Sequence, residues 1–128
     1  MKKNVLDIGN CNPDHHALKA MLTRGYDVEV LRAHELRDAV EILGKQSVDL
    51  IVVNRKLDID YSDGLEVLKS LKQNESFRHI PVMIITNYPE HQQDAVEDGA
   101  EYGFGKLQYK DAATHERLSR FLEKSSQS

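Results

Sequence analysis

The stretch DLIVVNRKLD, residues 49–58, decides the fold, because a run of apolar residues ends abruptly at Asn54. The continuous apolar run 49–53 predicts a strand that is buried on both faces, as a central strand of a parallel sheet is. In open α/β sheets, functional side chains lie just beyond the carboxyl ends of such strands. An amide at this position, which is neither a nucleophile nor a charge, is therefore the feature that needs an explanation.

Strands and helices are predicted to alternate on both sides of this run. Further strands are expected at 4–8, 27–31, 80–86 and 101–104, and helices at 13–25, 34–44, 65–71, 89–99 and 111–124. Five strands alternating with five helices predict an α/β domain, with a parallel sheet covered by helices on both faces. We expect one domain over 1–124, followed by a frayed tail at 125–128.

The composition excludes several classes of protein. A formal net charge of −4 over 128 residues, without any basic run longer than two, argues against nucleic-acid binding. No apolar stretch approaches the ~18–20 residues of a membrane span, and Asp7 comes too early for a signal peptide. The single cysteine, Cys11, excludes an internal disulfide and fits a reducing compartment, so we expect a cytoplasmic protein.

The loops that follow four of the strands are expected to form one site. The carboxyl ends of parallel strands meet at the same edge of the sheet, where ligands of such folds bind. In this sequence those loops are GNCN (9–12), NRKLD (54–58), TNY (86–88) and GKLQ (105–108). Residues from distant parts of the chain should therefore come together there.

Four segments give the sequence a family resemblance. DLIVVN (49–54), SDGLEVLKSLK (62–72), IPVMIIT (80–86) and GAEYGFGK (99–106) resemble, in order and spacing, the receiver domain of two-component response regulators. The resemblance covers essentially the whole chain. It implies a CheY-like, flavodoxin-like doubly wound sheet with the strand order 2-1-3-4-5. It also implies a site in which an acidic pair binds Mg²⁺ and an aspartate accepts a phosphoryl group from a histidine kinase.

The site residues match this family only in part. Thr86 and Lys106 stand where the resemblance places a Thr or Ser after the fourth strand and a Lys after the fifth. Asn54 stands at the phosphoacceptor position. The acidic pair falls on Gly9–Asn10 or on Asn10–Cys11, depending on the register, and neither choice supplies an acid.

Three further departures surround the site. The family's Lys-Pro dipeptide becomes Lys106–Leu107, and its switch aromatic becomes Gly103, with Tyr102 beside it. The loop between Asn54 and Asp63 is longer than usual.

These substitutions remove the chemistry of phosphorylation. An amide has no anionic oxygen with which to attack phosphorus, and Mg²⁺ is usually held through carboxylates. The sequence therefore predicts a non-enzymatic pseudo-receiver without a cofactor or Mg²⁺, which acts by contact with a protein partner or with a second copy of itself. Without the acids of the site, Lys106 is expected to pair with Asp7, Asp58 or Asp60, or to turn into solvent.

Two other functions are compatible with the sequence. In the first, Asp58 or Asp60 in the lengthened loop accepts the phosphoryl group in place of residue 54. In the second, the pocket that has lost its acids binds a small molecule or an anion. Asp7 could also rebuild a metal site with Asp58, although a strand residue hydrogen-bonded by neighbouring amides is the commoner role. Cys11 is expected to be a small loop residue and not a redox thiol.

An interaction face is predicted near the C-terminal half of the chain. Its aromatic residues are Tyr88, Tyr102, Phe104 and Tyr109, and aromatic side chains are favoured anchors of protein interfaces. The helix 89–99 offers only Ala95 and Val96 as clear apolar anchors, so it is expected to pack loosely. All six histidines are expected at the surface.

Overall fold

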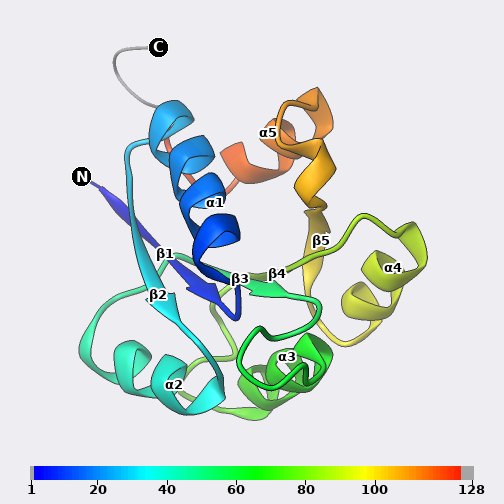
Figure 1. Ribbon diagram of the computed structural model, residues 1–128. Coiled ribbons are helices and arrows are strands. Elements are labelled where there is room, and N and C mark those ends of the chain that lie inside the picture. Colours follow the sequence, from blue (N-terminus) through cyan, green and yellow to red (C-terminus); the bar gives the residue numbers. More distant parts are fainter. Residues whose placement is uncertain (1, 125–128) are drawn as a thin grey trace.

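The computed structural model describes residues 2–124 and contains a five-stranded parallel sheet with helices on both faces (Figure 1). The strands are β1 (Lys3–Ile8), β2 (Val28–Ala33), β3 (Leu50–Asn54), β4 (Val82–Ile85) and β5 (Glu101–Phe104). The helices are α1 (Asn12–Gly25), α2 (Leu36–Lys45), α3 (Gly64–Gln73), α4 (Pro89–Glu97), the short 3₁₀ helix η1 (Lys106–Gln108) and α5 (Ala112–Ser119).

The strand order is β2-β1-β3-β4-β5, so the predicted fold class and order are confirmed. The predicted tail at 125–128 lies outside the described residues. Within the described part of the chain, no helix is both long and apolar enough to cross a membrane.

The sheet separates two apolar cores, which explains why β3 is apolar throughout. Helices α1 and α5 cover one face, and α2, α3 and α4 cover the other (Figure 1). Leu50 and Val52 belong to the first core, whereas Ile51 and Val53 belong to the second, and all four side chains are fully buried. Burying an aliphatic side chain stabilises a fold by about 1.5–3 kcal/mol, so this strand is a large contributor to stability.

The last helix is shorter than the sequence suggests. The periodic pattern predicts a helix over 111–124, but α5 ends at Ser119. The chain then turns, the Asp27 amide donates to the Glu123 carbonyl at 2.9 Å, and Lys124 forms a bridge with Tyr26. Leu122 stays buried because the turn returns it to the core under α1.

Candidate functional site

A cavity of about 270 Å³ opens where β3, β4 and β5 end. Asn54, Thr86 and Lys106 line it, so the structure brings these three predicted residues together. Gly9, Asn10 and Cys11 do not line it. The other lining residues are Arg55, Lys56, Ile85, Asn87, Tyr88 and His91. Among the described residues no carboxylate lines this cavity, whereas three cationic side chains do.

Asn54 uses its amide to hold the loop that follows it. Its Nδ2 donates to the carbonyl oxygen of Lys56 at 2.7 Å, and its backbone is still paired in register with Ile85 of β4. Thr86 is nearly buried, and its Oγ1 lies 3.3 Å from Nδ1 of His91 on α4. The two side chains at the strand ends therefore have partners within the protein.

The lengthened loop covers the end of β1. Leu57 in this loop is buried, and a Cβ atom on Gly9 would clash with the Leu57 side chain. Gly9 has φ +86°, a conformation that residues with side chains rarely adopt. The Asp58 amide donates to the Gly9 carbonyl at 2.9 Å, which fixes the loop in place. Position 9 thus has no room for a carboxylate.

A buried polar cluster lies behind the end of β1. Asp7 Oδ1 accepts a hydrogen bond from Asn10 Nδ2 at 2.6 Å, and its Oδ2 accepts one from His15 Nδ1 at 2.7 Å. Burial raises the pKa of Asp7, and the bonds from His15 and Asn10 partly oppose this. The expectation of a surface position is wrong for His15, which is 7% exposed. The spacing of residues in the sequence does not indicate the Asp7–His15 pair, because the contact depends on the direction of the His15 side chain on α1.

Lys106 pairs with Asp14, a partner that the sequence did not indicate. The Lys106 ammonium lies 2.6 Å from Asp14 Oδ2 in the first turn of α1 (residues 12–25). The expected partners Asp7, Asp58 and Asp60 are wrong: Asp7 is engaged by His15, and the other two are exposed in the loop. The hydrogen bond from Lys106 lowers the pKa of Asp14, and a bond with the Cys11 thiol adds to this.

Gln92 anchors α4 in place of an apolar residue. Its Nε2 donates to the Ile84 carbonyl at 2.9 Å, and its Oε1 accepts from the Gly103 amide at 2.8 Å. Gln92 is 2% exposed, whereas Val96, an expected anchor, is 40% exposed. The sequence pattern gives no signal for this role of Gln92. Gly103 permits the close approach of the chain, because a Cβ atom there would clash with the Ile84 carbonyl.

The predicted aromatic face is divided by the fold. Phe104 is fully buried and packs edge-on against Tyr109, so it cannot belong to an exposed face. The Arg117 guanidinium lies over the Tyr102 ring, with its central carbon 4.3 Å from the ring centre. Tyr88 is 59% exposed, and Leu107, which is not one of the expected aromatic residues, is 84% exposed.

The model of the response regulator receiver domain matches residues 14–125. The chain belongs to this family. It is a receiver domain of two-component-type signalling, a class of module that interacts with protein partners. A search of curated proteins gave no match.

Solved receiver structures share the fold at low sequence identity. A putative response regulator from Chloroflexus aurantiacus has 17% identity and a TM-score of 0.79, with 94% of this chain and 98% of that chain covered. The chemotaxis protein CheY4 of Vibrio cholerae has 21% identity and a TM-score of 0.71, with 95% and 100% covered. The receiver domain of a histidine kinase from Syntrophus aciditrophicus has 27% identity and a TM-score of 0.69, with 93% and 89% covered.

Replacing Asp14 by Asn should reveal the ion pair with Lys106. Because the pKa of Asp14 is lowered in the folded state, the pair stabilises above the ordinary value of 3.8 and is lost as pH falls through the folded value. Both side chains are partly exposed, so solvent screening limits the loss at pH 7 to about 0.5–1 kcal/mol. Urea unfolding from pH 2 to 7 measures it, with the exposed Glu41→Gln as the control. An equal effect of both variants at every pH would contradict the pairing.

Replacing Gln92 by Ala should loosen α4. The change leaves the buried Gly103 amide without its acceptor, which costs about 1–3 kcal/mol of unfolding free energy. Gln93→Ala on the same helix is the matched control, since Gln93 is exposed, and should cost less than about 0.5 kcal/mol. Denaturant unfolding and amide hydrogen exchange at Gly103 measure the difference, and similar costs for both variants would exclude the anchoring role.

Proposed function

We propose that this receiver signals by protein contact without aspartyl phosphorylation, as a pseudo-receiver with no enzymatic step. The observation that carries the proposal is the amide of Asn54 at the acceptor position, bonded to the Lys56 carbonyl. An amide does not form an acyl phosphate, because it lacks the anionic oxygen that attacks phosphorus. The single cysteine fits a reducing compartment, and the proposal places the module in the cytoplasm.

The surroundings of the site support the loss of the metal. Phosphoryl transfer depends on positioning and on compensation of phosphate charge, which Mg²⁺ supplies when carboxylates hold it. Here Leu57 covers Gly9, and Asn10 is turned inward onto Asp7. Asp14 does not line the cavity, and its carboxylate forms an ion pair with Lys106. Restoring one acid at position 54 would therefore not rebuild a metal site.

The same contacts favour a single arrangement of the signalling half of the domain. Lys106 ties the end of β5 to α1, and Gln92 ties α4 to β4 and β5. Moving α4 would break buried hydrogen bonds, which are costly to leave unmade. A partner would thus meet a surface that is already formed.

The partner surface that fits this proposal lies around Tyr88 and Leu107. Tyr88 and Leu107 are large, exposed and close in the chain to the site cavity. Such side chains are anchors of interfaces when they become desolvated. Another protein and a second copy of this chain both fit, and sedimentation of the purified chain over a range of concentrations separates them.

If the protein acts without phosphorylation, phosphoryl donors and their analogues should not change it. Incubation with acetyl phosphate and Mg²⁺ should leave the intact mass unchanged. Beryllofluoride with Mg²⁺ should cause no saturable amide shifts at Asn54, Thr86 and Lys106. The Asn54→Asp variant supplies a nucleophile, but it should still show no saturable Mg²⁺ shifts, because Gly9, Asn10 and Cys11 supply no second carboxylate.

Two results would contradict the proposal. One is a phosphoryl group on Asp58 or Asp60, which would support the displaced acceptor. Against that alternative, neither residue lines the cavity of Thr86 and Lys106. The other is a saturable beryllofluoride response of the unmodified chain that spreads to residues 89–109.

A second candidate function is the binding of a small anion in the vacated cavity. Arg55, Lys56 and Lys106 line it, together with the Thr86 hydroxyl and the Asn54 amide. Arg55 forms an ion pair with Asp63, and Lys106 forms one with Asp14. Within residues 2–124, Lys56 forms no ion pair with a carboxylate, so its charge is available to an anion.

Thermal unfolding with phosphate or sulfate, at an ionic strength held constant with chloride, tests the anion site. A midpoint that rises with the anion and returns to the chloride value in Lys56→Gln is expected for specific binding. Lys45→Gln, exposed at the end of α2, is the control. An anion effect that is unchanged in Lys56→Gln would exclude this site.

A further inference from the structure

A second cavity lies on another part of the surface, between α1 and residues 109–115, which include the beginning of α5. It has a volume of about 400 Å³, within the range of small-molecule sites. Its lining residues are Ala17, Ala20, Met21, Arg24, Gly25, Tyr109, Lys110 and His115. Within residues 2–124 this set shares no member with the cavity at Asn54. We call it the α1–α5 groove.

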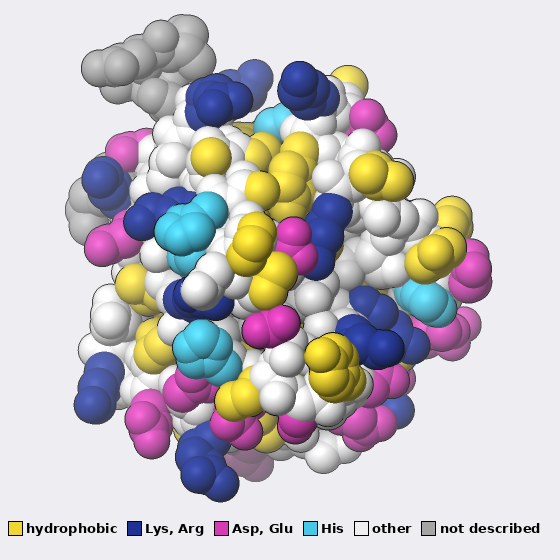
Figure 2. All heavy atoms as spheres, in the orientation of Figure 1, with side chains coloured by type: hydrophobic (Ala, Val, Ile, Leu, Met, Phe, Trp, Pro, Cys, Tyr) yellow, Lys and Arg dark blue, Asp and Glu magenta, His cyan; other side chains and the backbone are white. Residues whose placement is uncertain are grey.

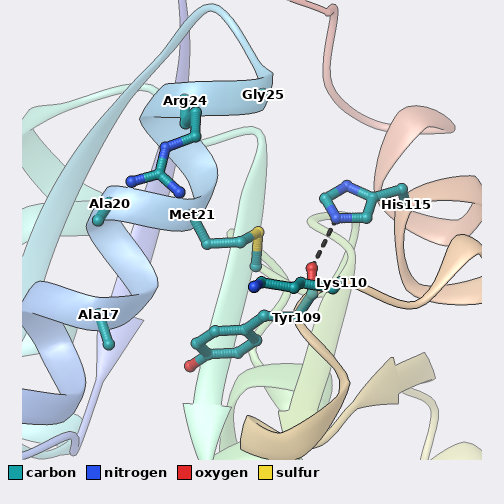
Figure 3. Close-up of a pocket in the computed structure, with 8 residues that line it drawn as sticks. All are labelled: Ala17, Ala20, Met21, Arg24, Gly25, Tyr109, Lys110 and His115. Atoms are coloured by element: carbon teal, nitrogen blue, oxygen red, sulfur yellow. Dashed lines mark hydrogen bonds between the residues drawn. The ribbon is translucent and has the colours of Figure 1, made fainter.

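The floor of the groove is apolar and its rim is cationic. Figure 3 shows Met21 reaching from α1 across the gap, with the Tyr109 ring below it and the Lys110 ammonium directed toward α1. Figure 2 shows the same region as a yellow band between α1 and α5, with dark blue side chains on either side. The small side chains of Ala17 and Ala20 leave the α1 wall open.

The charges of this rim have no counter-ions in the described structure. No Asp or Glu lines the groove, and neither Arg24 nor Lys110 forms an ion pair within residues 2–124. In contrast, the neighbouring Lys106 is neutralised by Asp14. The groove therefore presents two uncompensated positive charges beside an apolar floor.

The wall formed by His115 is fixed in position. Its Nε2 donates to the Tyr109 carbonyl at 2.7 Å, shown as the dashed line in Figure 3. Its Nδ1 lies 2.7 Å from the Tyr26 hydroxyl, and the two rings stack with their centres 5.8 Å apart. Tyr109 itself packs edge-on against the buried Phe104. A groove held in this way is preorganised, which reduces the entropic cost of binding.

We propose that the α1–α5 groove binds a small organic acid, with its apolar body against Met21 and Tyr109 and its carboxylate at the rim formed by Arg24 and Lys110. The volume suits a compact molecule, and charge complementarity selects an anion over a neutral compound or a cation. This site is separate from the proposed partner surface, so it stands whether or not the phosphorylation-independent function does.

Amide NMR of the full chain tests the proposal with a defined probe. 1-Naphthoate joins an apolar double ring to one carboxylate, and 1-naphthalenemethanol is its neutral analogue. Naphthoate should cause saturable shifts at Met21, Arg24 and residues 109–115, without shifts at Asn54 or Thr86. The alcohol should bind about three- to tenfold more weakly, the range expected for one or two partly exposed charge pairs.

Three variants separate charge, space and general effects. Arg24→Gln with Lys110→Gln should weaken naphthoate to the affinity of the alcohol, while Lys19→Gln, on α1 outside the groove, should leave it unchanged. Ala20→Phe should abolish the binding of both probes by filling the groove while every charge is kept. Each variant is accepted only if its amide spectrum away from the groove matches that of the parent.

Several outcomes would overturn the proposal. These are equal affinity for the acid and the alcohol, an effect of the double variant no larger than that of Lys19→Gln, or no saturable shifts at the groove. Shifts at these residues with an acidic amphipathic peptide, but not with naphthoate, would instead assign the groove to a protein partner.

Discussion

The ion pair between Lys106, at the end of β5, and a carboxylate on α1 determines which charges remain at the site. The family resemblance implies acids after the first and third strands, but this chain has Asn10 and Asn54 there. Asp14, in the first turn of α1, supplies the charge to Lys106 instead. The ion pair joins α1 to η1, and the strand ends are left with amides, a hydroxyl and cationic side chains.

Another acid of this region, Asp7, is buried inside the first strand and has its own partners. An ionised carboxylate in such a place is costly unless hydrogen bonds satisfy it. His15 and Asn10 supply those bonds, and Asn10 is thereby turned away from the cavity. Both carboxylate oxygens of Asp7 thus have partners, whereas the buried Oδ1 of Asn10 has none within residues 2–124, and Leu57 closes the space above Gly9.

The sequence predicts most strands and helices well for a physical reason, whereas the strand order was implied by the family resemblance. A strand covered on both faces must be apolar throughout, so LIVV and VMII were recognisable without their partners. The convergence of Asn54, Thr86 and Lys106 followed from the parallel strand order. The partner of Lys106, the burial of His15 and the role of Gln92 did not, because each depends on side-chain directions in three dimensions. Phe104 was misplaced for the same reason: a short strand such as EYGF does not reveal which residues face the core.

Gln92 bears most directly on how the domain would act. Its hydrogen bonds hold α4 against both β4 and β5. In this chain, a shift of α4 relative to β4 would break the bond from Gln92 to the Ile84 carbonyl, and a shift of α4 relative to β5 would break the bond from the Gly103 amide to Gln92. A partner that recognises the formed surface pays no conformational cost, because the binding-competent state is the populated one. Under the proposed function, phosphorylation at Asn54 does not control signalling. Signalling would then be controlled by the amounts of this protein and of its partner.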